Sequence, residues 1–157
     1  MSGEPGVSHH GTTVALDRTV PAVPAGVRPL AAEVRGAVTG LTGDARLDDL
    51  EQATAEVLAN AVEHGSVAGG HIRVEVEVGA DEVVVRVADA GQGEVPARSQ
   101  VEGLDPATSG AERGRGLWLL YRLADRASFR RTATGRVTEV GWRRAPSAQP
   151  QGLQGEV

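Results

Sequence analysis

The sequence predicts an α+β fold, a two-layer sandwich in which one mostly antiparallel, mixed sheet carries helices on one face. Residues 71–78 and 82–88 alternate apolar and polar side chains, as half-buried strands do, and Gly79-Ala80-Asp81 between them suits a hairpin turn. Residues 47–64 instead repeat apolar side chains at the spacing of a helix. The order along the chain is strand, helix, helix, two strands, loop, helix and two strands, which favours one sheet with its helices on one side.

The first two elements are predicted from the same patterns. Residues 12–19 alternate as a strand, and Pro21 and Pro24 end it because proline cannot donate to a strand ladder. A helix is expected over about residues 27–41, since four apolar residues fall on one of its faces: Val27, Leu30, Val34 and Val38.

The helix expected over residues 47–64 has two separate stripes. Its apolar stripe consists of Leu47, Leu50, Thr54, Val57 and Ala61. At about 100° per residue, Glu56, Asn60 and Glu63 lie on a different face. The apolar stripe predicts how the helix packs on the core, and the polar stripe carries the candidate chemistry.

The second half of the chain contains a long loop and three further elements. Residues 90–113 are rich in Gly, Pro, Ser and acidic residues and are too long for an ordinary connection. Such loops are usually functional lids or disordered, and we expect a lid there. A helix over about 116–125 and strands over 127–132 and 136–142 complete one domain, residues 12–144. The remaining residues, 1–11 and 145–157, are expected to be disordered tails.

Composition sets the class of the protein. The 157 residues are typical of one domain, and 40% hydrophobic residues with a net charge of −5 exclude a disordered chain. Without cysteine, there is no disulfide framework and no thiolate nucleophile. The N-terminus lacks a signal segment and no apolar run approaches the ~18 residues of a membrane span, so the cytoplasm is the expected location.

All 16 basic residues are arginine. The absence of lysine excludes the P-loop, which places a lysine on the phosphates, and the eukaryotic-type protein kinase site, which needs a strand lysine. If the chain handles ATP, the phosphates must therefore meet backbone N–H groups, arginine and Mg²⁺.

Nine of the arginines lie between Arg113 and Arg144, where the only acidic residues are Asp125 and Glu139. Such a basic half can meet nucleic acid. The arginines are scattered over a helix and two strands with no aromatic interleaving, which favours a solvated basic surface or one that faces an acidic protein partner.

Three short segments follow one another in the chain: Glu56-x-x-x-Asn60, Asp89-Ala-Gly91-Gln-Gly93 and Gly114-Arg-Gly116-Leu117. Together they resemble the ATP site of the GHKL (Bergerat) superfamily, which includes gyrase B, Hsp90, histidine kinases and MutL. The resemblance covers roughly residues 12–143 and implies the Bergerat fold. The chain lacks the extra elements of sensor kinases and of gyrase B, so it is most similar to the serine-kinase anti-sigma factors.

The helix residues of these motifs suit phosphoryl transfer. The side-chain oxygen of Asn60 is a hard ligand for Mg²⁺, and the matching asparagine of the family binds the Mg²⁺ that bridges the phosphates. The carboxylate of Glu56, one turn earlier, can accept a proton, and the resemblance implies that it is the general base. The alternatives are an ordinary surface asparagine and a solvated glutamate.

The other motif residues suit nucleotide contacts. Asp89 follows a buried strand, where a carboxylate needs a partner, and the family uses the matching aspartate to accept the adenine amino group. Gly91 and Gly93 let backbone approach the ligand, although a plain turn explains them as well. Gly114 and Gly116 mark a helix N-terminus that suits anions, next to Leu117, and two arginines lie beside them as candidates for the γ-phosphate: Arg113 and Arg115.

The resemblance implies an ATP- and Mg²⁺-dependent protein serine/threonine kinase that acts as an anti-sigma factor. Its partners would be a sigma factor and a STAS-type anti-anti-sigma factor, the phosphorylation substrate, with a homodimer expected and neither direct nucleic-acid binding nor a membrane. Two alternatives remain open: a catalytically inactive ATP-binding module that controls a partner through the state of its lid, and a histidine kinase catalytic domain that acts in trans.

Overall fold

The computed structural model describes residues 11–42, 44–64, 69–92 and 112–144. Its five-stranded sheet has the order β1-β2-β3-β5-β4, and each neighbouring pair of strands is antiparallel. The strands are β1 (Thr13–Pro21), β2 (His71–Val78), β3 (Glu82–Asp89), β4 (Arg126–Thr132) and β5 (Gly135–Arg143). The predicted α+β sandwich is confirmed, but the predicted mixed sheet is wrong in one respect, because no parallel pair occurs among the described strands.

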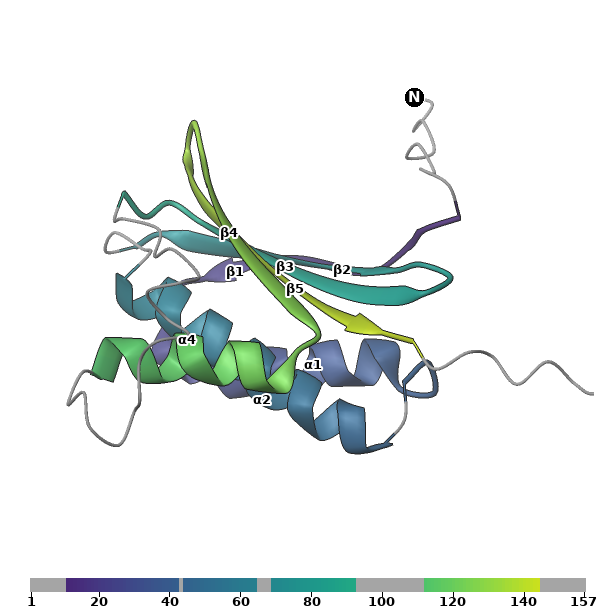
Figure 1. The fold of residues 1–157 in the computed structure, drawn as a ribbon. Coiled ribbons are helices and arrows are strands. Elements are labelled where there is room, and N and C mark those ends of the chain that lie inside the picture. The colour runs from purple at the N-terminus through teal and green to yellow at the C-terminus, as the bar shows by residue number, and fades with distance from the viewer. Residues whose placement is uncertain (1–10, 43, 65–68, 93–111, 145–157) are drawn as a thin grey trace, which may run out of the picture.

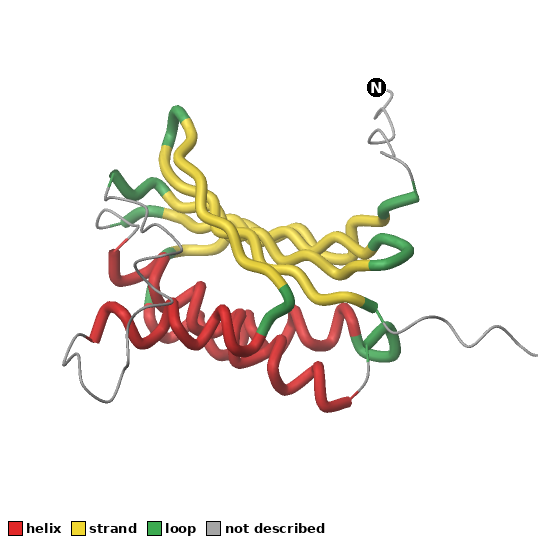
Figure 2. Tube along the Cα trace, in the orientation of Figure 1, coloured by secondary structure: helices red, strands yellow, loops and turns green. Residues whose placement is uncertain are grey.

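The described helices cover one face of this sheet and leave the other face open (Figures 1 and 2). They are α1 (Val27–Val38), preceded by a 3-10 turn η1 (Pro24–Gly26), then α2 (Asp44–His64) and α4 (Glu112–Leu123). Helix α2 lies in the middle, since both α1 and α4 pack against it. No helix in the described ranges is long and apolar enough to cross a membrane.

The core lies between the helices and the sheet, as the alternation predicts. On β2 the residues Ile72, Val74, Val76 and Val78 are buried, and the intervening ones are not. All five residues of the predicted apolar stripe of α2 are buried: Leu47, Leu50, Thr54, Val57 and Ala61. Aliphatic residues therefore form most of this core, and Trp142 on β5, which is fully buried, is its largest side chain.

Most predicted elements lie where the sequence places them, with ends that shift by up to three residues and one start that shifts by four. Helix α1 ends three residues before the expected Leu41, because Gly40, at φ 87°, takes a left-handed conformation that suits glycine. Helix α4 begins four residues before the expected Gly116. Most of the expected tails, 1–10 and 145–157, and residues 93–111 of the expected lid lie outside the described residues.

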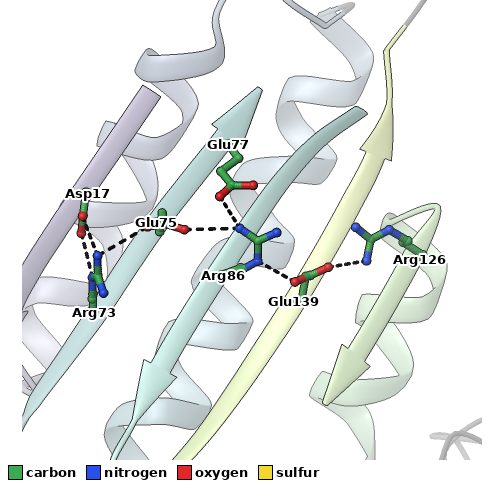
Figure 3. A network of polar contacts seen from close by, with 7 residues as sticks. All are labelled: Asp17, Arg73, Glu75, Glu77, Arg86, Arg126 and Glu139. Atoms are coloured by element: carbon green, nitrogen blue, oxygen red, sulfur yellow. Dashed lines mark hydrogen bonds and ion pairs between the residues drawn. The ribbon is translucent and has the colours of Figure 1, made fainter. Parts of the chain in front are cut away.

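The open face of the sheet carries a network of ion pairs that crosses all five strands (Figure 3). Near its centre, Arg86 of β3 contacts Glu77 of β2 at 2.8 Å and Glu139 of β5 at 2.6 Å. Glu139 also accepts a hydrogen bond from Arg126 of β4 at 2.7 Å, and at the other edge Arg73 of β2 pairs with Asp17 of β1. Cross-strand pairs of opposite charge stabilise a sheet face that no helix covers.

Glu139 is the most enclosed acid of this network, with a side chain that is 19% exposed. Burial on its own would raise the pKa of Glu139, but hydrogen bonds from Arg126 and Arg86 hold it below the usual value. Burial on its own would lower the pKa of Arg86, but its hydrogen bonds to Glu77 and Glu139 raise it, so Arg86 and Glu139 are both charged in the folded protein at neutral pH.

Glu139→Gln is expected to lower the free energy of unfolding at pH 7 by about 2 kcal/mol, because two guanidinium groups lose a charged partner. The folded-state pKa of Glu139 lies below that of the unfolded chain, so this stability is present above about pH 4.3 and is lost as the pH falls through the folded pKa. Urea unfolding at pH 7 and at stepwise lower pH should therefore show the two proteins converging in acid. Glu33→Gln, which removes the exposed partner of Arg18, is the control and should cost less than about 1 kcal/mol. A constant difference across the pH range would contradict the assignment.

Candidate functional site

The ends of two helices and one strand, which carry the motif residues, meet at one end of the molecule. The C-terminal end of α2, the end of β3 and the beginning of α4 lie there together (Figure 1). Asn60 is in the last turns of α2, and Asp89 is the last residue of β3. The fold therefore brings all three sequence motifs to the same side of the helical layer, where the sheet ends.

Glu56 and Asn60 lie one turn apart on α2 and are both half-buried. The helix forms because its apolar stripe packs on the sheet, and this packing turns the two polar side chains to the margin of the buried face. Each is then partly shielded from water and still accessible to a ligand. The placement agrees with the predicted polar stripe.

Glu56 also lines an open groove of about 750 Å³ between α2 and the region where η1 leads into α1. The walls are mostly small apolar side chains, among them Ala22, Ala25, Ala55 and Ala59, and the charged groups at the groove are Arg28, Glu56 and Glu63. A smaller groove of about 380 Å³ adjoins it and shares Arg28, Ala55 and Glu56. Glu56 thus borders an open groove, a feature that the helical pattern alone does not predict.

Asp89 is nearly buried, with a side chain that is 5% exposed. Its Oδ1 accepts a hydrogen bond from the backbone N–H of Gly91 at 2.7 Å, which closes a tight turn directly after β3. Nε of Arg136 lies 3.4 Å from the same oxygen. The carboxylate thus has partners within the protein, and one of them is a residue that the sequence patterns did not identify. The predicted contact with adenine stays a prediction.

The beginning of β5 packs on the backbone of Asp89. A Cβ atom on Gly135 would lie 2.8 Å from Cα of Ala90 and still closer to the carbonyl oxygen of Asp89. Only glycine permits this approach, although the sequence indicates it merely as a turn residue between two strands. Gly135 therefore fixes where β5 begins relative to Asp89.

Two arginines of the β4–β5 hairpin hold this same segment. Arg131 and Arg136 are cross-strand partners. Arg131 donates from Nη1 to the carbonyl oxygen of Gln92 at 3.2 Å, while Arg136 lies against Asp89. Nothing in the local sequence distinguishes these arginines from the other seven of the C-terminal stretch, because their role depends on the register between β3 and β5.

The glycines of the third motif lie inside a helix. The sequence predicts that Gly114 and Gly116 mark the N-terminus of a helix that begins at about Gly116, but both lie within the first turns of α4, since the helix begins at Glu112. Glycine normally disfavours a helix interior, yet the flanking residues are of types that form helices well. The backbone of Arg113, Arg115 and Leu117 is also in α4, while their side chains and all of Gly93 lie outside the described part of the chain.

The described residues hold no cluster of three or more His, Asp or Glu side chains that would bind a metal by itself. A single side-chain oxygen such as that of Asn60 fits a different kind of site. Mg²⁺ at nucleotides is commonly held by one or two protein oxygens together with the substrate phosphates and water. The donor set at α2 is therefore compatible with a metal that arrives with its nucleotide.

Several C-terminal arginines are engaged within the protein rather than gathered on one exposed patch. Arg126 pairs with Glu82 and Glu139, Arg144 donates to the carbonyl oxygen of Gly79 at 2.6 Å, and Arg122 stacks on Trp118. The expectation of a solvated surface, or of one that faces an acidic protein partner, stays a prediction.

Comparisons with known proteins bear on the fold and the family of this chain. No curated protein matches the chain. Among solved structures, it resembles the RsbU and RsbW domains of Rv1364c from Mycobacterium tuberculosis, with 21% identity and a TM-score of 0.58. That match covers 82% of this chain but 32% of the other, so this chain spans about a third of its length, and the likeness is one of fold. Residues 20–142 match the family model of the histidine kinase-like ATPase domain. The chain therefore belongs to the histidine kinase-like ATPase domain family.

Proposed function

We propose that this protein is an ATP- and Mg²⁺-dependent protein serine/threonine kinase that acts as an anti-sigma factor. It would bind a sigma factor, phosphorylate a STAS-type anti-anti-sigma factor and work as a homodimer. The observation that carries the proposal is the pair of Glu56 and Asn60 on α2, in a domain of this ATPase family, with Glu56 open to a groove. The fold shared with a structure that contains an RsbW domain supports the same branch.

In this proposal the nucleotide binds where α2, the end of β3 and the start of α4 meet. The carboxylate of Asp89 accepts the amino group of adenine, and the turn through Gly91 lets the base approach the backbone. The phosphates lie toward the first turns of α4, whose N–H groups and dipole favour anions. Asn60 would hold Mg²⁺, which would neutralise charge on the phosphates.

The acceptor hydroxyl belongs to a protein segment that lies in the groove beside Glu56. Its oxygen forms a bond to the γ-phosphorus while the bond from that phosphorus to the bridging oxygen of ADP breaks. Glu56 takes the proton that the hydroxyl loses. Positioning supplies most of the rate in such a transfer, and the rigid packing of α2 between α1 and α4 provides it.

Asn60→Ala is expected to weaken ATP binding about tenfold in the presence of Mg²⁺ and to leave binding in EDTA nearly unchanged, because only the metal loses a ligand. Isothermal titration calorimetry with ATP, with and without Mg²⁺, measures both values. Asn60→Asp keeps an oxygen ligand and should retain the dependence on Mg²⁺. An Asn60→Ala protein that binds Mg²⁺-ATP as the wild type does would remove Asn60 from the site, and a wild type that binds no ATP would refute the proposed function.

A further inference from the structure

We propose that Arg136 is a positioning residue for recognition of the nucleotide base. Through its contact with Oδ1 it holds the Asp89 carboxylate in the orientation in which the other oxygen, Oδ2, faces the base. This inference rests on the proposed function, since it takes Asp89 as the acceptor for the adenine amino group.

The first argument is the register of the sheet. Asp89 and Arg136 are directly opposed in the β3–β5 ladder. Two residues earlier on β3 and two later on β5 the opposed pair is Val87 and Thr138, and the alternation places all four on the helix-covered face. At the end of the sheet beside the proposed nucleotide site, Arg136 is thus the cross-strand neighbour of Asp89.

The second argument is electrostatic. Asp89 is 5% exposed and Arg136 is 18% exposed, so neither charge is well hydrated, and each would be costly to bury alone. A guanidinium is always charged and therefore provides a permanent partner for the carboxylate. At 3.4 Å the contact is long for a hydrogen bond, so it acts chiefly as a charge that orients Asp89.

The third argument is that the two carboxylate oxygens of Asp89 have different surroundings. Within the described ranges, the Gly91 amide and the Arg136 guanidinium both lie against Oδ1. Oδ2 is then the oxygen that remains to accept a hydrogen bond from a ligand. A base that presents an amino group is favoured there, while a base that presents a carbonyl oxygen at the same position is repelled.

The surrounding backbone keeps this arrangement rigid. Gly135, directly before Arg136, lies against the backbone of Asp89 and Ala90. From the neighbouring strand, Arg131 holds Gln92 by a hydrogen bond to its carbonyl oxygen. The backbone that carries Arg136 is therefore held in place, so its guanidinium can orient the Asp89 carboxylate. If Arg136 only stabilised the end of the sheet, its replacement would lower the stability of the protein and leave the preference between nucleotide bases unchanged. Measuring that preference therefore separates the two roles.

The test compares ATP with purine riboside 5′-triphosphate, which lacks the amino group, by calorimetry in Mg²⁺. The wild type is expected to prefer ATP by about tenfold or more, as a hydrogen bond to a charged group implies. Arg136→Met should reduce this preference at least fivefold, Arg136→Lys should restore most of it, and Asp89→Asn defines its complete loss. Arg130→Met removes a neighbouring arginine on the opposite face of β4 and should leave the preference unchanged.

An Arg136→Met protein that keeps the wild-type preference, even with weaker binding of both nucleotides, would overturn the inference and leave the proposed function intact. If that variant does not fold, Arg136→Gln, which retains a polar donor without the charge, is measured instead and is expected to show the same loss. A wild type that binds ATP without preferring it over the analogue would refute the role of Asp89 and with it that of Arg136. A wild type that binds neither nucleotide would overturn the proposed function itself.

Discussion

Glu56→Gln is expected to reduce phosphoryl transfer to a serine by about 10²–10⁴-fold while ATP still binds with nearly wild-type affinity. Glutamine preserves the size and polarity of the side chain but cannot accept the proton of the attacking hydroxyl. The loss should appear in the rate of transfer of labelled γ-phosphate to purified STAS-type proteins at saturating ATP. Calorimetry on the same variant gives the ATP affinity.

Glu33→Gln is the matched control for this variant. Glu33 is another helix carboxylate, placed on α1 and paired with Arg18 at the surface, and its loss should leave the transfer rate unchanged. A Glu56→Gln protein that transfers phosphate at the wild-type rate would exclude Glu56 as the base. A wild type that binds ATP and phosphorylates none of these proteins would instead favour the non-catalytic module.

Gly135→Ala is expected to destabilise the protein by about 3 kcal/mol and to weaken ATP binding about tenfold. The added Cβ would lie 2.8 Å from Cα of Ala90 and closer still to the carbonyl oxygen of Asp89, so the backbone of β3 and β5 must separate. Because the displaced peptide carries the Asp89 carboxylate, stability and base recognition should fall together. Urea unfolding and calorimetry with ATP measure the two effects.

Gly36→Ala provides a control of opposite sign. A Cβ at Gly36, on an exposed part of α1, would meet no atom within 4 Å. Alanine is the better helix former, so this variant should gain about 0.5–1 kcal/mol and bind ATP unchanged. If Gly135→Ala were as stable as the wild type, the close approach of β5 to Asp89 would not be a constraint on the site.

The parts of the fold that depend on local periodicity could be predicted from the sequence. The apolar stripe of α2 and the alternation of β2 are properties of short segments, and their burial follows from one face being apolar. The positions of Glu56 and Asn60 follow with them, since a helix fixes which residues share a face. The start of α4 lies four residues before the predicted one, because the two glycines suggest the beginning of a helix whereas the helix already includes them.

The contacts that complete the candidate site depend on pairing between distant segments. Asp89 and Arg136 are 47 residues apart and meet only because β3 and β5 pair in one particular register. Gly135 has the same origin, since its lack of a side chain matters only once another strand lies against it. The groove at Glu56 likewise requires η1 and α1 to be placed beside α2. None of these distances is encoded in a pattern within one segment.

The two tryptophans of the chain give the protein a pair of intrinsic fluorescent probes in different surroundings. Trp142 is fully buried in the core and donates from Nε1 to the carbonyl oxygen of Leu123 at 2.9 Å, so its emission reports on global unfolding. Trp118 lies half-buried on α4 with the guanidinium of Arg122 over its ring. In a Trp142→Phe background, the remaining emission would come from Trp118, on the helix proposed to receive the phosphates. A change in that fluorescence would then report nucleotide binding without an added label.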